Sequence, residues 1–314
     1  NSILKKLLIV TDFFLPHTSG ITTYIQNLIK VLKNKKFEIT ILTCDHSGTL
    51  CPTEHIDNIK ILRSENTFSL SRGFYSFDLI KKFMHESKKA DYINIHYPIT
   101  EIFPLIFLSN KPIFLNYHCL PSGNSLLLKF IHFYFYFFGI ISILLSKKVI
   151  VFTKDYFYSF SFHKIFKKKI IEILPFIENN LILNNDFTKT LNEETIKIGF
   201  LGRLGEEKGL KDLIKASEIM ISKKIRHSIK IAGDLKDARF KKHINDLLEL
   251  RVNNNCINFI GKIDEDKKSD FFNSIDVLVL PSTNSFEAFG LVQLEAMSFG
   301  KPVIASNLRG VRIP

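Results

Sequence analysis

Cysteine, glycine and proline are scarce in this sequence of 314 residues. The four cysteines are scattered and form no C-x-x-C pair, which excludes a disulfide scaffold and a zinc ribbon. Glycine and proline occupy only 14 and 10 positions against 46% hydrophobic residues, so the chain is not disordered, collagen-like or of low complexity. We therefore expect a reduced, cytoplasmic protein, and the length predicts two domains.

Acidic residues are also few relative to basic ones, at 31 against 43, which gives a formal net charge of +12. The lysines are spread along the whole chain, with only short runs such as 167–169. No RNP aromatics, zinc-finger spacing or basic zipper occurs, so we expect no nucleic-acid partner. The charge indicates either a solvated lysine-rich surface or a preference for anionic membranes or substrates.

Short apolar runs alternate with amphipathic stretches. Strands are predicted at 7–10, 37–43, 59–62, 92–96, 112–117, 149–153 and 170–174, with helices at 21–32 and 77–88. After a polar, asparagine-rich segment, further strands are predicted at 196–201, 229–232, 257–260, 277–280 and 303–305. This alternation is typical of parallel sheets covered by helices. We predict an α/β protein with one domain at 1–180, a linker at 181–195 and a second domain at 196–314.

One segment, 126–145, is nearly all apolar and about long enough to cross a bilayer. It contains Lys129, His132 and Ser142, and strands of the same α/β pattern are predicted on both sides of it. A membrane span would put these two halves in different compartments, so we predict instead a helix packed on the sheet. Its outer face would then be available for peripheral contact with the inner face of an anionic membrane.

Glycines flank an arginine and a lysine where the strand at 196–201 gives way to a helix, predicted from Glu207. The segment reads Gly202-Arg203-Leu204-Gly205-Glu206-Glu207-Lys208-Gly209. Arginine can bind a phosphate through two hydrogen bonds, and lysine adds a mobile point charge. The order of residues is neither that of a P-loop nor that of the G-x-G-x-x-G fingerprint. The segment is a candidate phosphate site, and a glycine-rich turn with exposed charges is the alternative.

A second loop, after the strand at 277–280, carries two carboxylates. We expect a helix to begin near Phe289. The unpaired amides and the positive dipole end of such a helix start suit a diphosphate. Glu287 lies just before that start and Glu295 about two turns inside, roughly 10 Å away. One carboxylate can then accept hydrogen bonds from a sugar and the other from a ribose. The alternative is that Glu295 is simply a surface residue of the helix.

These segments resemble the retaining glycosyltransferases of family 4, and the similarity covers nearly the whole chain. It is most specific at Gly202-Arg203-Leu204 with Lys208-Gly209, at the E-x7-E pair Glu287 and Glu295, and over 295–306. The resemblance implies the GT-B fold, in which two Rossmann-like doubly wound domains face each other across a cleft that holds the donor. Family members continue past the segment similar to 311–314, so we expect the second domain to be truncated at its C-terminus.

The resemblance also implies roles toward a nucleotide-diphosphate-sugar donor, with no cofactor and no metal. Arg203 and Lys208 hold the diphosphate, and Glu287 contacts the donor sugar. Glu295 binds the ribose hydroxyls. The backbone groups of the implied site belong to Phe289, Gly290 and Leu291 beside the sugar and to Lys262 beside the base. Lys262 follows Gly261, and a glycine after a strand lets the backbone approach a flat ligand.

The first half matches the family less closely. Gly20 ends a loop that the family closes with a Gly-Gly pair near the β-phosphate, and Ser19 replaces the first of these glycines. His118 matches the family histidine that faces the donor sugar, where a neutral imidazole can accept from or donate to a hydroxyl. His96 stands at a His-x-Pro corner, and its alternative is a residue that only lines the cleft.

Asp264-Glu265-Asp266 spells D-x-D, the metal motif of the other glycosyltransferase fold. It precedes a predicted helix at 267–273, so we interpret Asp264 as the N-cap of that helix.

The predicted function is transfer of a sugar from the nucleotide-diphosphate donor to a hydroxyl of a polysaccharide, lipid-linked or other glycan acceptor, with retention of configuration. The resemblance implies front-face attack, in which the departing diphosphate helps to take the acceptor proton and the protein supplies positioning and charge stabilisation. The predicted catalytic residues are Glu287, His118, Arg203 and Lys208. A nucleotide-sugar epimerase and a non-catalytic sugar-nucleotide-binding subunit are the alternatives.

Overall fold

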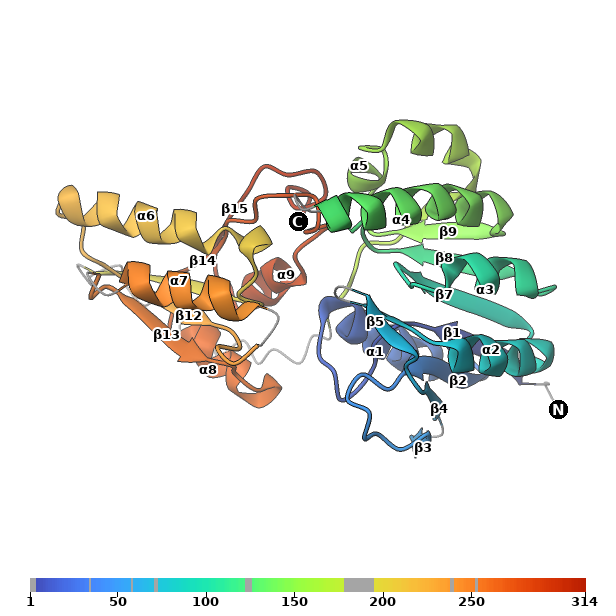
Figure 1. Cartoon of the computed structure of the whole chain (residues 1–314). Helices are drawn as coiled ribbons and strands as arrows, with labels where there is room; N and C mark the ends of the chain where they lie inside the picture. The colour runs from blue at the N-terminus through green and yellow to red at the C-terminus, as the bar shows by residue number, and fades with distance from the viewer. Residues whose placement is uncertain are drawn as a thin grey trace. The chain divides into compact units, whose positions relative to one another are not determined.

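The computed structural model of the chain divides into two units, Asn1–Phe176 and Ile177–Pro314. Each unit is a parallel sheet covered by helices (Figure 1). The structure describes residues 4–33, 35–57, 59–70, 73–121, 126–177, 195–237, 240–251 and 254–314. The predicted linker, 181–195, lies outside the described residues except for Thr195.

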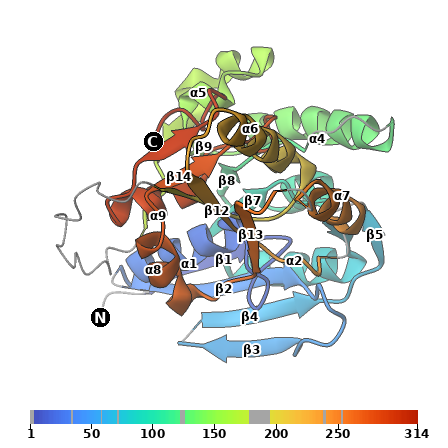
Figure 2. The ribbon, with the colours of Figure 1, turned by 90° about the vertical axis from the view of Figure 1, so that its left-hand side faces the viewer.

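The first unit is built on an eight-stranded sheet in the order β10-β9-β8-β7-β1-β2-β4-β3. Its strands are β1 (Lys5–Val10), β2 (Phe37–Cys44), β3 (Thr53–Ile56), β4 (Ile59–Ser64), β7 (Tyr92–Tyr97), β8 (Ile113–Tyr117), β9 (Lys148–Val151) and β10 (Ile170–Glu172). The strands β5 (Phe68–Leu70) and β6 (Gly73–Tyr75) form a separate hairpin. Only β3 runs antiparallel to its neighbour, at the edge of the sheet (Figure 2). The strand order changes direction between β1 and β7, which is where doubly wound sheets bind ligands at their carboxyl ends.

Helices cover both faces of this sheet: α1 (Gly20–Lys33), α2 (Phe77–Lys89), α3 (Ile102–Leu108), α4 (Leu126–Leu145), α5 (Lys154–Phe157) and the 3₁₀ segment η1 (Ser161–Lys169). Tyr24 of α1 packs on the rings of His96 and His118, with centroids 5.9 and 5.4 Å apart. Phe135 of α4 packs on Tyr97 at 5.7 Å. Since neighbouring residues of a strand point to opposite faces, α1 and α4 lie on opposite sides of β7.

The long apolar segment forms α4, and one side of this helix packs on the sheet. Its buried residues recur with helical spacing: Ile131, Phe135, Gly139, Ser142 and Ile143. A Cβ on Gly139 would lie 2.8 Å from the Tyr97 hydroxyl, so glycine permits the close approach of helix and strand. Among the described helices α4 alone is long and apolar enough to cross a membrane by length and composition, and 28% of its most apolar stretch is buried.

The second unit has a five-stranded sheet in the order β13-β12-β11-β14-β15. Its strands are β11 (Ile196–Leu201), β12 (His227–Ala232), β13 (Ile257–Gly261), β14 (Val277–Leu280) and β15 (Val303–Ala305). All pair in parallel. The helical segments are η2 (Glu206–Lys208), α6 (Leu210–Ser222), α7 (Lys241–Arg251), η4 (Glu265–Lys267), α8 (Lys268–Asn273) and α9 (Leu291–Ser298). The strand order reverses between β11 and β14, so the loops after these strands meet at the ligand-binding edge.

Two helices begin a few residues after their predicted starts. The helix expected near Phe289 begins at Leu291, because Gly290 has a φ of +79°, a left-handed conformation that ends the preceding loop. The helix expected from Glu207 is a short 3₁₀ turn, and α6 starts only after Gly209, whose φ is +66°. The prediction that Asp264 caps the helix at 267–273 is wrong, because the N-cap of α8 is Lys267. Asp264 stands at the N-cap position of the preceding 3₁₀ turn η4, where its side chain makes no capping hydrogen bond.

Candidate functional site

The loops after β11 and β14 are locked together at the reversal point of the second sheet. The Thr283 N–H donates to the Glu207 carbonyl at 2.9 Å. A Cβ on Gly209 would collide with the Pro281 carbonyl oxygen, so only glycine allows this approach. The structure thus brings together the two segments that the sequence singled out separately.

The central contact of the site is an ion pair between the two loops. Lys208 Nζ donates to Glu287 Oε2, and the Ser282 hydroxyl lies 3.3 Å from the same oxygen. The Lys208 and Glu287 side chains are only 14% and 12% exposed. Because both charges are largely removed from water, their attraction is stronger than that of a surface pair. Lys208, which is predicted to bind the diphosphate, and Glu287, which is predicted to bind the sugar, thus contact each other directly.

Arg203 is anchored beside this pair by a buried carboxylate. Its Nη2 lies 3.5 Å from Glu207 Oε1, and its guanidinium lies over the Phe286 ring at 5.6 Å. The Arg203 side chain is 40% exposed, whereas that of Glu207 is 5% exposed. A Cβ on Gly205 would collide with the Glu207 carboxylate, so the glycine makes room for this anchor. The sequence contained Glu207 within the motif but gave no sign of this role.

Glu295 has a cationic partner, Lys268, that the sequence did not predict. Its Oε1 lies 3.0 Å from Lys268 Nζ, which also contacts Glu265 at 2.9 Å. Burial acts to lower the pKa of Lys268, but the Glu295 and Glu265 carboxylates outweigh it and raise that pKa. Glu295 is one turn inside α9, not two, because the helix begins at Leu291. With side chains 20% and 18% exposed, Lys268 and Glu295 form a half-buried pair, so Glu295 is more than a solvated surface residue.

The backbone groups proposed from the resemblance lie at different places. Phe289 and Gly290 are buried and lead directly into α9 at Leu291. Lys262 is exposed and follows Gly261, whose φ is +81° with open space where a Cβ would stand. Since β13 is separated from β11 by β12, Lys262 lies at the outer edge of this sheet and not at its reversal point.

In the first unit, Ser19 is explained by helix capping. Its hydroxyl accepts a hydrogen bond from the Thr22 N–H at 3.2 Å, and its carbonyl accepts from Thr23 N–H at 2.9 Å. These contacts make Ser19 the N-cap of α1, which begins at Gly20. Neither Ser19 nor Gly20 has a positive φ, so the backbone here does not require a Gly-Gly pair.

His118 follows β8 and is paired with a second histidine. Its Nε2 lies 2.9 Å from His96 Nδ1, and the two residues are 4% and 1% exposed. Burial lowers the pKa of His118 to about 3, and burial together with His118 lowers the pKa of His96 well below its usual value. Both imidazoles are therefore neutral at physiological pH. The two ring nitrogens of His96 face His118 and Asn94, so its contacts are with other buried side chains of the first unit.

Two buried carboxyl groups at the reversal point of the first sheet were not predicted from the sequence. Asp12 follows β1 and is 8% exposed, and Glu101 precedes α3 and is 0% exposed. Burial raises the pKa of Glu101 to about 7, and burial reinforced by Glu101 raises that of Asp12. The Ser76 N–H donates to Glu101 Oε1, which is a favourable contact for an ionised carboxylate. No local spacing in the sequence links these two residues.

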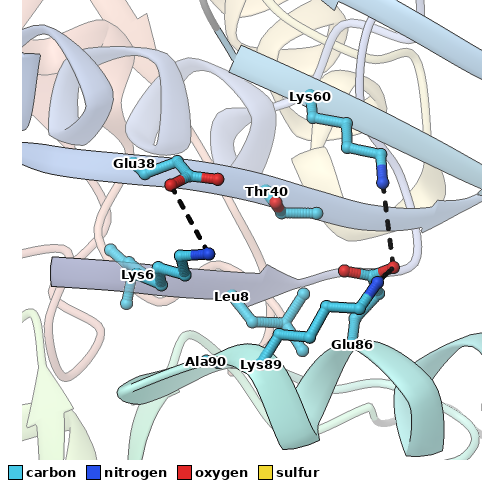
Figure 3. Close-up of a pocket in the computed structure, with 9 residues that line it drawn as sticks. Lys6, Leu8, Glu38, Thr40, Lys60, Glu86, Lys89 and Ala90 are labelled. Atoms are coloured by element: carbon cyan, nitrogen blue, oxygen red, sulfur yellow. Dashed lines mark hydrogen bonds and ion pairs between the residues drawn. The ribbon is translucent and has the colours of Figure 1, made fainter. Parts of the chain in front are cut away.

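A charged pocket at the other end of the first sheet is a poor candidate. Figure 3 shows its lysines and glutamates at the amino ends of β1, β2 and β4 and on α2. The charges are paired with one another: Lys6–Glu38 at 3.8 Å, Lys60–Glu86 at 3.7 Å and Lys89–Glu86 at 3.0 Å. Because ligands of doubly wound sheets bind at the carboxyl ends, this pocket is on the wrong side.

Comparison with known proteins identifies both halves of the chain. Residues 18–157 match the family model described as Glycosyltransferase Family 4, and residues 183–312 match the model described as Glycosyl transferases group 1. An uncharacterized glycosyltransferase of Methanocaldococcus jannaschii is 28% identical over 98% of this chain and 81% of its own length. The capsular polysaccharide biosynthesis glycosyltransferase CapM of Staphylococcus aureus is 30% identical, over 45% of this chain and 35% of its own.

Solved structures show the same fold. Sucrose-phosphate synthase from Thermosynechococcus elongatus has a TM-score of 0.74 at 17% identity and covers 98% of this chain and 82% of its own. Anabaena HepE in complex with UDP and glucose has a TM-score of 0.69 at 17% identity, with the same coverage of both chains. The fold together with the two matched family models defines a GT-B glycosyltransferase. Within that class the chain belongs to the family 4 and group 1 glycosyltransferases, as the sequence motifs predicted.

Proposed function

We propose that the protein transfers a sugar from a nucleotide-diphosphate-sugar to a hydroxyl of a polysaccharide, lipid-linked or other glycan acceptor, with retention of configuration. The observation that carries the proposal is the Lys208–Glu287 pair at the reversal point of the second sheet, with Arg203 anchored beside it. A cation bound to a carboxylate at the ligand edge is ready to exchange that partner for a phosphate. The solved complexes of Anabaena HepE with UDP and UDP-glucose support this class of donor.

In this proposal donor binding separates the ion pair. Lys208 moves its charge to the diphosphate, and Glu287 becomes available to accept hydrogen bonds from the sugar hydroxyls. Arg203 binds the phosphates from the position that Glu207 gives it, and the amides at the start of α9 add their positive dipole end. Glu295 binds the ribose, the backbone at Lys262 meets the base, and the first unit contributes Gly20 and His118. These groups stabilise the leaving diphosphate, and no side-chain base is required.

A calorimetric panel of nucleotide sugars, followed by transfer assays, tests the proposal. We expect Arg203→Ala and Lys208→Ala to weaken donor binding, while Lys215→Ala, which removes an exposed lysine on α6, has no effect. Conversion of the donor without any acceptor would identify an epimerase instead. Donor binding with no transfer to any glycan acceptor would identify a binding subunit.

We further propose that the first unit works at the cytoplasmic surface of an anionic membrane through α4 and η1. Phe130 and Phe133 of α4 are each 67% exposed, and Ile165 of η1 is 73% exposed. Exposed lysines accompany Ile165 at positions 164, 167 and 168. Lys169 joins the two segments, because its Nζ donates to the Ser146 carbonyl at 2.9 Å just after α4. Exposed aromatic residues beside lysines suit shallow insertion into an anionic bilayer.

Sedimentation with vesicles tests this surface. We expect the protein to bind vesicles that contain phosphatidylglycerol and to be released by high salt, because the lysine contribution is screened. Phe130→Ser with Phe133→Ser should abolish binding. Phe77→Ser is the matched control, since Phe77 is an exposed aromatic residue at the start of α2, at 55%. Equal binding of neutral and anionic vesicles, or of both variants, would contradict the proposal.

A further inference from the structure

Four polar side chains form a buried row on one face of β7 and β8. Asn94 and His96 lie two residues apart, as do Asn116 and His118, so each pair shares a face of the sheet. The register places His96 opposite Asn116. The four residues are between 1% and 5% exposed. The row therefore runs through the interior of the first unit to the carboxyl end of β8, where His118 stands.

Hydrogen bonds determine which atom of Asn94 faces His96. The Asn94 amide nitrogen donates to the Phe114 carbonyl at 2.9 Å, and the Asn116 amide nitrogen donates to Asn94 Oδ1 at 3.0 Å. Asn94 Oδ1 lies 3.0 Å from His96 Nε2. Because an amide oxygen only accepts hydrogen bonds, the Nε2 of His96 carries the proton. The Asn116 nitrogen lies 3.2 Å from the same Nε2 and could in principle donate to it. In that case a lone pair on Nε2 would face the nearer Asn94 oxygen, and the two acceptors would repel each other.

The tautomer of His96 then determines that of His118. A neutral imidazole with a proton on Nε2 has a lone pair on Nδ1. His118 Nε2 lies 2.9 Å from His96 Nδ1 and therefore donates to it. The second nitrogen of His118, Nδ1, is left as an acceptor. It is buried and has no hydrogen-bond partner among the residues that the structure describes.

The ring of His118 is also held in place from its sides. Tyr24 packs against it edge-on at 5.4 Å, and Phe152 packs against it at 5.0 Å. A buried acceptor without a partner is costly, since it has lost its hydrogen bonds to water. A ligand hydroxyl that donates to Nδ1 would recover that loss.

We propose that Asn94 and His96 are positioning residues that hold His118 in its Nε2-protonated tautomer, so that its Nδ1 accepts a hydrogen bond from one hydroxyl of the donor sugar. The role toward the sugar rests on the proposed function, whereas the tautomer rests only on the contacts within the first unit. His118 so held rejects a donor sugar in which that hydroxyl is replaced by fluorine, because a C–F group cannot donate.

The tautomer is measured directly by two-bond ¹H–¹⁵N correlation spectra of the imidazole rings in the full chain. His118→Gln assigns the resonance. We expect wild-type His118 to be neutral at pH 7 with the proton on Nε2. A proton on Nδ1, or a charged ring, overturns the proposal, and this measurement requires no destabilising variant.

Two matched variants test the relay, by which we mean the positioning of His118 by Asn94 through His96. Asn94→Leu removes the acceptor of His96, so we expect a mixture of His118 tautomers and a roughly tenfold loss of kcat/KM with nucleoside-diphosphate affinity unchanged. Asn116→Leu removes an equally buried amide and leaves the Asn94–Phe114 bond, so His118 should keep its tautomer. An unaltered tautomer in Asn94→Leu contradicts the relay.

Titration with UDP-glucose distinguishes the relay from the proposed function. A hydrogen bond from the sugar shifts the Nδ1 resonance of His118, whereas UDP alone leaves it unchanged. If the tautomer is as expected but UDP-glucose binds without shifting Nδ1, the contact with the donor sugar is wrong and the relay stands.

Discussion

Replacing Lys208 by alanine should destabilise the second unit as well as weaken donor binding. The change leaves the Glu287 carboxylate, 12% exposed, with the Ser282 hydroxyl at 3.3 Å in place of a cation. Exposed ion pairs contribute about 0.2–1 kcal/mol, and breaking a fully buried pair costs about 3–5 kcal/mol. For this largely buried pair we expect a loss of about 1–3 kcal/mol in the free energy of unfolding.

The same substitution removes a charge-assisted contact to the diphosphate, worth about 1.5–3 kcal/mol. The dissociation constant for UDP should therefore rise roughly 10- to 150-fold. Glu287→Gln should have the opposite effect on UDP, because it releases Lys208 and removes a negative charge near the phosphates. This variant should bind UDP at least as tightly as the wild type, yet transfer sugar poorly.

The double variant Lys208→Ala/Glu287→Gln separates folding from binding. Because this variant has no unpaired carboxylate at position 287, its melting temperature should return toward that of the wild type. Its affinity for UDP should stay weak, because Lys208 is still missing. Thermal unfolding and calorimetry with UDP measure the two quantities, with Lys215→Ala as the charge control. A double variant that recovers both stability and affinity would refute the assignment of Lys208 to the diphosphate.

Further predictions concern the ribose, the loop contact and the buried carboxyl pair. Glu295→Gln should abolish any preference for UDP over 2′-deoxy-UDP in calorimetry, and a preference kept intact would count against the ribose contact. Gly209→Ala should destabilise by more than about 2 kcal/mol in thermal melts, because the new Cβ meets the Pro281 carbonyl. Gly48→Ala, with φ +74° but open space, should cost only about 1 kcal/mol, and equal costs would argue against the close loop contact. For Glu101 the folded-state pKa is raised to about 7 from 4.5, so the unfolded chain loses its proton first as pH rises. Wild-type stability should fall between about pH 4.5 and 7 by up to about 3 kcal/mol more than that of Glu101→Gln in urea titrations, and parallel profiles would contradict this assignment.

The sheets and the two phosphate-loop segments were predictable because their signals are local. Runs such as residues 196–201 are mostly apolar and are followed directly by a glycine, and Arg203 and Lys208 lie within a few residues of that end. The family resemblance joined these residues to Glu287 and Glu295 across a long stretch of sequence. The resemblance did not show that any of these residues contact one another. The Lys208–Glu287 ion pair is visible only in the folded structure, where both loops are placed.

The rest of the candidate site depends on long-range packing. Lys268 approaches Glu295 and Asp12 couples to Glu101 through the arrangement of whole strands and helices, which no spacing in the sequence reveals. The buried row that ends at His118 alternates with apolar residues, as any half-buried strand does, so its polarity alone did not identify a network. The start of α9 moved to Leu291 because Gly290 takes a left-handed conformation, which local propensity does not specify.

Sugar transfer by the full chain can be measured directly. The full chain is incubated with the nucleotide sugar that binds best and with a glycan acceptor, and nuclear magnetic resonance follows the anomeric proton of the product. We predict that nucleoside diphosphate and glycoside appear in equal amounts, that the anomeric configuration of the donor is retained, and that Lys208→Ala/Glu287→Gln is inactive while Lys215→Ala is not. An inverted product would contradict transfer with retention, and full transfer by the double variant would contradict the roles of Lys208 and Glu287.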